Sequence, residues 1–233
     1  MNPRTRIFQA ALLSCIAFSG CVKKQETVDR PVFEPYEIDS CLAISIDLSG
    51  SFANDFGERA YPLVLDLMDT FTDQSMGAEC KIVLSQMSGH DQVVLFEGSP
   101  AELRHEFGSP EQMATFLRDH SKPDRSPIYV ATRKTVDYVN LMNGISEKTR
   151  VLTVILSDMR DSESDQSKRS QEGFRMLASL ETYRERGGSL ALYFVEQEEV
   201  PRWKEILGRA GFAEGQFVIS NSLESNPQLP RFD

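Results

Sequence analysis

Short runs of β-branched and aliphatic residues alternate along this chain with longer stretches of helical spacing, and this alternation restricts the possible folds most strongly. The short runs end at Gly, Asp, Ser or charged residues, and we expect strands over residues 42–47, 81–87, 92–96, 150–157, 189–195 and 216–219. Apolar residues recur at helical spacing around residues 61–68, 113–117, 128–141, 174–183 and 203–207. Strands that alternate with helices indicate a parallel or mostly parallel sheet with helices on both faces.

The interval between the second and third runs departs from this alternation. It holds only Ser88, Gly89, His90 and Asp91, which is too short for a crossover helix. These two strands must therefore form an antiparallel hairpin, which we place at one edge of the sheet. The predicted fold class is α/β, with a doubly wound, mostly parallel six-stranded sheet, one antiparallel edge hairpin strand and helices on both faces.

The charge of the chain excludes some classes of partner. Its 233 residues include 35 Asp and Glu against 25 Lys and Arg, a formal net charge of −10. Phosphate backbones repel an acidic chain whose basic residues are scattered, so we expect no nucleic-acid partner. No apolar run reaches the roughly 20 residues of a membrane-spanning helix, which excludes a multi-pass membrane protein.

The first twenty residues have the pattern of a secretory signal. Arg4 and Arg6 precede a short apolar stretch over residues 7–18, and no acidic residue is present. Residues 18–21, Phe-Ser-Gly-Cys, resemble the bacterial lipobox, in which the cysteine is lipidated and becomes the mature N-terminus. We therefore expect acyl chains on Cys21 to hold the protein on a membrane surface outside the cytoplasm. The alternative is an ordinary signal peptide that leaves Cys21 unmodified.

The resemblance to lipoproteins also bears on which membrane carries the anchor. Val22 follows the cysteine, where Gram-negative lipoproteins retained in the inner membrane commonly have aspartate, so the outer membrane is favoured if the cell has one. The next residues are polar and charged and include prolines. We accordingly divide the chain into a signal peptide (1–20), a lipidated flexible tether (21–39), a folded domain (40–222) and a C-terminal tail (223–233).

Two cysteines remain for the mature domain. Of the four in the sequence, Cys15 lies in the signal peptide and Cys21 is the predicted lipidation site. Cys41 and Cys80 are left, and in an oxidising compartment they are candidates for a disulfide. Two buried free thiols are the alternative.

The first predicted strand ends in a motif suited to binding a hard cation. Asp47, Ser49 and Ser51 stand at alternating positions around Gly50, and a helix is expected to follow. Ligands of open α/β sheets bind beyond the carboxyl ends of the strands, where this loop would lie. One carboxylate and two hydroxyls can face one point if the loop turns tightly, which offers oxygen ligands to a divalent cation.

This motif, with the helix after it and a hairpin as the next strand pair, resembles the von Willebrand factor type A domain and its metal-ion-dependent adhesion site. The resemblance spans roughly residues 40 to 220. The family completes its site with a threonine before a mid-chain helix and an aspartate at the tip of the fourth strand, and the resemblance places Ser126 and Asp158 there. The departure from threonine to Ser126 keeps the hydroxyl and loses a methyl group.

The resemblance implies a Rossmann-like sheet and a metal site of Asp47, Ser49, Ser51, Ser126 and Asp158. An octahedral site of such ligands suits Mg²⁺ best, with Mn²⁺ or Ca²⁺ as alternatives. In the family, a protein partner supplies an Asp or Glu to the open position of the metal, which implies adhesion or envelope assembly. Without a cation, Asp47 and Asp158 would face each other with like charge.

Two other functions are alternatives to this one. The first is a metal-independent structural lipoprotein of the envelope. The second is a metal-dependent hydrolase, because an aspartate at a strand tip also begins the haloacid-dehalogenase phosphatases. Those enzymes need a second acid where this chain has Ser49, and no nucleophile elbow, Walker lysine or Gly-x-Gly-x-x-Gly loop is present. We therefore expect that the chain is not an enzyme.

A further acidic feature follows the fourth predicted strand. Asp158, Asp161, Glu163 and Asp165 crowd one loop. Such a run can raise the local concentration of cations, or it can be an ordinary solvated acidic loop.

Overall fold

The computed structural model describes residues 37–49, 60–74, 79–88, 92–120, 125–222 and 227–231. The predicted signal peptide, the predicted lipidation site Cys21 and the predicted ligand Ser51 lie outside the described residues. Within the described ranges, none of the helices is both long enough and apolar enough to span a membrane.

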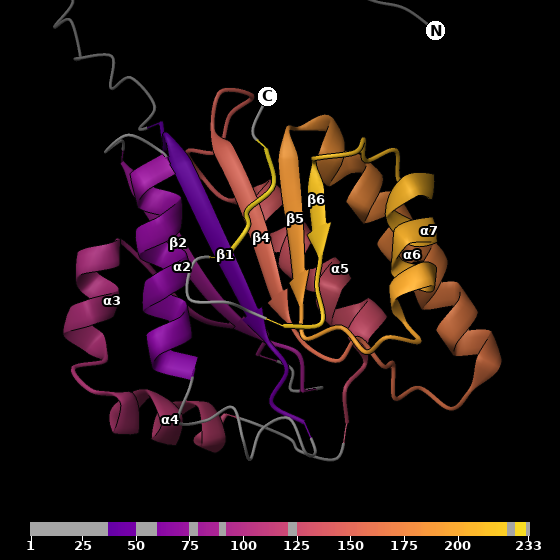
Figure 1. Cartoon of the computed structure of the whole chain (residues 1–233), viewed down its shortest axis with the longest axis horizontal. Coiled ribbons are helices and arrows are strands. Elements are labelled where there is room, and N and C mark those ends of the chain that lie inside the picture. Colours follow the sequence, from indigo (N-terminus) through magenta and orange to yellow (C-terminus); the bar gives the residue numbers. More distant parts are fainter. Residues whose placement is uncertain are drawn as a thin grey trace, which may run out of the picture. The chain divides into compact units, whose positions relative to one another are not determined.

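The strands of the described chain form one six-stranded sheet in the order β3-β2-β1-β4-β5-β6. Their bounds are Ser40–Ile46 (β1), Cys80–Gln86 (β2), Val94–Gly98 (β3), Arg150–Leu156 (β4), Gly188–Tyr193 (β5) and Phe217–Ile219 (β6). Strand β1 pairs in parallel with β2 and β4, β4 with β5, and β5 with β6, while β2 and β3 are antiparallel. Figure 1 shows β1, β4, β5 and β6 side by side. The predicted α/β class, with an antiparallel strand at one edge, is confirmed.

Helices cover both faces of this sheet. They are Ala60–Gln74 (α2), Pro100–Glu106 (α3), Pro110–Asp119 (α4), Ile128–Leu141 (α5), Gln166–Glu185 (α6) and Val200–Arg209 (α7). Side chains alternate along β1: Leu42, Ile44 and Ile46 pack with α2, α3 and α4, whereas Cys41 and Ala43 pack with α5, α6 and α7. Because both faces are buried, the central strands are mostly apolar, and their few polar side chains, such as Ser45 and Thr153, are buried as well.

Two helices differ from the sequence prediction. Helix α3 was not predicted, although Ser99 and Glu102 form a capping box at its start, with Pro100 as the first helical residue. Helix α6 begins at Gln166 rather than near residue 174, after the N-cap Asp165. The first part of α6 is polar, so it gives no apolar periodicity in the sequence.

The candidate disulfide between Cys41 and Cys80 is not formed in the structure, and both cysteines are free thiols, which was the alternative. In the parallel register, Cys41 lies opposite Lys81, and Cys80 lies opposite Ser40. Cys41 packs with the α5 side of the sheet, whereas Cys80 packs with the α2 side, so the sheet separates the two sulfurs. Burial raises the pKa of the Cys41 thiol to about 12.

Part of the segment expected as a C-terminal tail packs against the domain. The hydroxyl of Tyr193 donates to the carbonyl of Gln228 at 2.7 Å, and the N–H of Arg231 donates to the carbonyl of Gly215 at 2.8 Å. Leu229 adds an apolar contact on the α2 side of the sheet. These contacts fix residues 227–231 beside β5 and the turn before β6.

Candidate functional site

The carboxylate of Asp47 is the centre of the candidate site. Asp47 directly follows β1, and only 1% of its surface is exposed. Its Oδ1 accepts hydrogen bonds from the N–H of Ser49 at 3.0 Å, the hydroxyl of Ser49 at 2.6 Å and the hydroxyl of Ser126 at 2.8 Å. Its Oδ2 accepts from the hydroxyl of Ser157 at 2.7 Å. Four donors therefore hold this buried carboxylate in one orientation.

Ser126 is fixed at the start of α5 by a pair of hydrogen bonds. Its N–H donates to the hydroxyl of Ser162 at 2.8 Å, and its carbonyl accepts from the N–H of Ser162 at 2.9 Å. Its own hydroxyl reaches both Asp47 and the hydroxyl of Ser49. The structure thus brings Asp47, Ser49 and Ser126 together, as the resemblance implied.

Asp158 lies next to this cluster, after β4. Its Oδ1 accepts from the N–H of Arg160 at 2.9 Å. Burial raises the pKa of Asp158; the Arg160 hydrogen bond opposes this shift, and the negative charge of Asp47 adds to it. Among the described residues, no hydrogen bond joins Asp158 to Asp47, Ser49 or Ser126, so Asp158 acts on the cluster through its charge in this structure.

Ser157 is a member of the cluster that sequence reasoning missed. Besides donating to Asp47, its hydroxyl accepts from the N–H of Met159 at 2.9 Å, where the chain turns with a φ of 64°. Strands β1 and β4 are parallel, and Ile46 lies opposite Leu156. The residues that follow these two strands are therefore neighbours at one edge of the sheet. Pairing the two predicted strands in this register would have placed Ser157 beside Asp47.

The acidic loop after β4 is organised by its own backbone. Asp161 accepts from the N–H groups of Glu163 at 2.8 Å and Tyr129 at 3.0 Å, which caps the start of α5. Glu163 accepts from the N–H of Asp165 at 2.9 Å. These carboxylates shape the loop that positions Ser126, a role that neither sequence interpretation of the acidic run foresaw.

The donor set of the cluster fits a hard divalent cation. Carboxylate and hydroxyl oxygens are the ligands that Mg²⁺ and Ca²⁺ prefer. Among the described residues, no ion pair joins Asp47 or Asp158 to a basic side chain, and Arg160 pairs with Glu196 and Glu198 instead. No group of three or more His, Cys, Asp or Glu suited to a metal occurs in these ranges. The hydroxyls are therefore indispensable members of any cation site here.

Comparison with known proteins shows the fold. No protein-family model and no curated protein matches the sequence. The structure is similar to the PilB minor pilin from Streptococcus sanguinis, with a TM-score of 0.52, 8% identity, and coverage of 82% of this chain and 58% of that one. It is also similar to the pilus adhesin SpaC from Lactobacillus rhamnosus GG, with a TM-score of 0.52, 9% identity, and coverage of 81% and 29%. The chain thus corresponds to only part of each protein, and identities this low establish the fold alone.

Proposed function

We propose that this chain is a membrane-anchored surface protein that binds a divalent cation at the Asp47 cluster and uses it to bind a protein partner. The observation that carries the proposal is the buried carboxylate of Asp47, which has hydroxyls from three separate loops around it and Asp158 beside it. It lies at the carboxyl edge of the sheet, where ligands of such folds bind. The similarity of the fold to a minor pilin and a pilus adhesin supports a surface role.

The residues that would hold the ion are Asp47, Ser49, Ser126 and Asp158, together with Ser51, which lies outside the described residues. Mg²⁺ suits these ligands best, with Mn²⁺ or Ca²⁺ as alternatives. The bound ion would supply a positive charge and an open position for an Asp or Glu of the partner. Ser157 orients the Asp47 carboxylate, and Ser162 holds the backbone of Ser126.

The anchor belongs to the same proposal. Acyl chains on Cys21 would hold the domain at the membrane surface, with the residues between Cys21 and Glu37 as the tether, because Ile38 is already buried in the domain. The outer membrane is favoured where the cell has one, and the role is adhesion or envelope assembly. We propose neither an enzymatic activity nor a nucleic-acid partner.

Affinity capture from membranes tests this function. The full-length chain is used with Mg²⁺ and with EDTA, beside the Asp47→Ala variant and a matched control, Asp119→Ala, whose side chain is exposed at the end of α4. We expect a partner that wild type and the control retain in Mg²⁺ but lose in EDTA, and that Asp47→Ala never retains. If Asp47→Ala fails to fold by circular dichroism, Ser126→Ala takes its place. The proposal is contradicted if wild type captures the same proteins in EDTA as in Mg²⁺, or if the site variant captures in Mg²⁺ everything that wild type does.

One observation favours a metal-independent function. The four hydrogen bonds to Asp47 satisfy its carboxylate without any ion. A structural envelope protein with this fold would bind its partner through a surface without a metal ion, and chelators would not weaken that binding. The capture experiment separates the two functions. Partners that Asp47→Ala and Asp119→Ala both retain in EDTA support the metal-independent structural function.

A further inference from the structure

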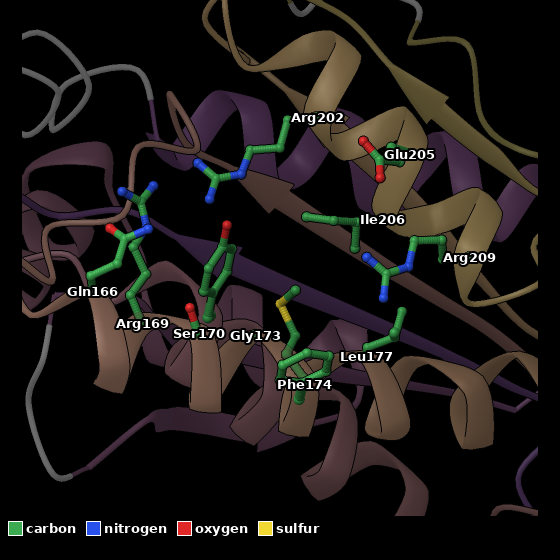
Figure 2. A pocket seen from close by; sticks show the side chains of 12 residues that line it. Gln166, Arg169, Ser170, Gly173, Phe174, Leu177, Arg202, Glu205, Ile206 and Arg209 are labelled. Carbon is green, nitrogen blue, oxygen red and sulfur yellow. The ribbon is translucent and has the colours of Figure 1, made fainter.

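A groove runs between α6 and α7 on the outer side of the sheet (Figure 2). Its volume is about 260 Å³. Each helix contributes apolar and basic side chains, which include Arg169, Phe174 and Leu177 from α6 and Arg202, Ile206 and Arg209 from α7.

The floor of the groove is apolar, and an exposed aromatic ring lies at its rim. Met176 lines the floor and is 1% exposed, and Leu177 and Ile206 are partly buried beside it. Phe174 is 68% exposed, and Leu141 is the other large hydrophobic residue exposed to a similar degree in the described part of the chain. An exposed aromatic ring beside a concave apolar surface is typical of an interaction site.

The charge of the groove is opposite to that of the chain. Three arginines and one acidic residue, Glu205, line it, whereas the whole chain has a net charge of −10. Figure 2 shows Arg169 and Arg202 at one end and Arg209 at the other.

These arginines are poorly paired. Within the described ranges, no ion pair holds Arg169 or Arg209. The Nε of Arg169 is buried without a hydrogen-bond partner, although its guanidinium group also interacts with the hydroxyl of Tyr129. Arg202 makes one long ion pair of 3.5 Å with Glu199. The guanidinium groups of Arg169 and Arg202 lie 5.9 and 5.4 Å from the ring centre of Tyr129, which keeps them over the groove. Guanidinium groups that have no ion pair, or only a long one, can bind the carboxylates of a partner.

We propose that this groove binds an acidic segment of a partner protein, which inserts one aromatic or aliphatic side chain between α6 and α7 and places carboxylates against Arg169, Arg202 and Arg209. The size of the groove favours such a segment over a free small molecule. Small-molecule pockets usually enclose about 300–1,000 Å³ and surround their ligand. A smaller open groove is suited to a single anchor side chain at a protein interface. Binding here does not require a cation at Asp47.

Fluorescence anisotropy with the full-length chain in EDTA tests the proposal. Three labelled five-residue peptides are compared: Asp-Glu-Phe-Glu-Asp, the same peptide with Ser for Phe, and Lys-Lys-Phe-Lys-Lys. We expect the acidic peptide with Phe to bind best, and its affinity to fall as salt is raised from about 50 to about 500 mM. Arg169→Gln and Arg209→Gln should each weaken it about tenfold, because each removes a charge-assisted hydrogen bond. Arg175→Gln is the matched control, since Arg175 lies on α6 outside the groove and pairs with Glu172.

Methyl NMR of methionine locates the bound peptide. The signal of Met176 should shift on binding, whereas that of Met68, which packs on the opposite face of the sheet, should not. The proposal is overturned if the basic peptide binds as tightly, if Arg169→Gln and Arg209→Gln bind like wild type, or if no binding occurs at millimolar peptide. Displacement of the peptide by an equal concentration of N-acetylphenylalanine also overturns it, because the groove would then be a small-molecule site.

Discussion

Replacing Ser157 with alanine tests whether the Asp47 carboxylate organises the ends of β1 and β4. The change removes a hydrogen bond to a buried charged group, which contributes about 1.5–3 kcal/mol. It also leaves the N–H of Met159 without its acceptor, at a cost of about 1–3 kcal/mol. Because local relaxation recovers part of these losses, we expect unfolding free energy to fall by about 2–4 kcal/mol, or roughly 5–15 °C in Tm for a domain of this size.

The assay is urea unfolding followed by circular dichroism, with Ser45→Ala as the matched control. Ser45 is as fully buried as Ser157, but its hydroxyl makes only a long bond of 3.5 Å to the hydroxyl of Thr135. We expect that control to lose about 1 kcal/mol or less. If Ser157→Ala and Ser45→Ala lose the same unfolding free energy, and the slope of that free energy with urea concentration is unchanged, the Asp47 carboxylate does not organise the ends of β1 and β4.

Three further predictions follow from individual residues. Ser126→Thr should keep any cation response of wild type, because the hydroxyl is retained, and isothermal titration of Mn²⁺ checks this. Cys41, with a pKa of about 12, should react with iodoacetamide at pH 8 only after unfolding, as peptide mass mapping would report; rapid labelling of the folded chain would contradict its burial. Gly188→Ala should destabilise the domain by about 1–3 kcal/mol, since the new Cβ would clash with the buried ring of Tyr183. The helical control Gly208→Ala has nothing within 4 Å and should gain about 0.5–1 kcal/mol in the same thermal melts.

Much of the fold could be predicted because both faces of the sheet are buried. Each central strand is then a mostly apolar run that differs from its polar surroundings, and the four-residue interval at 88–91 leaves no alternative to a hairpin. The helix at Pro100–Glu106 was missed because it is short and buries little. The spacing of Ser99 and Glu102 is nevertheless the sequence signature of a capping box.

The candidate site was only partly predictable. The resemblance to the type A domain predicted that Ser126 would lie beside Asp47. To predict that Ser157 also contacts Asp47, one must know the register in which β1 and β4 pair. The separation of Cys41 and Cys80 depends on the same kind of register, because neighbouring residues on a strand point to opposite faces. The groove between α6 and α7 depends on how two helices pack together, which no local pattern encodes.

Thermal unfolding of the full-length chain in Mg²⁺, Mn²⁺ or Ca²⁺ and in EDTA tests the central claim most directly. A cation that binds only the folded state at about one hundred times its Kd stabilises it by roughly 2.7 kcal/mol, which corresponds to about 5–11 °C in Tm. We predict such a rise for wild type with at least one of these ions, and none for Asp47→Ala. A wild-type Tm that is the same in all three ions as in EDTA, or an equal rise in the variant, would contradict a cation site at Asp47.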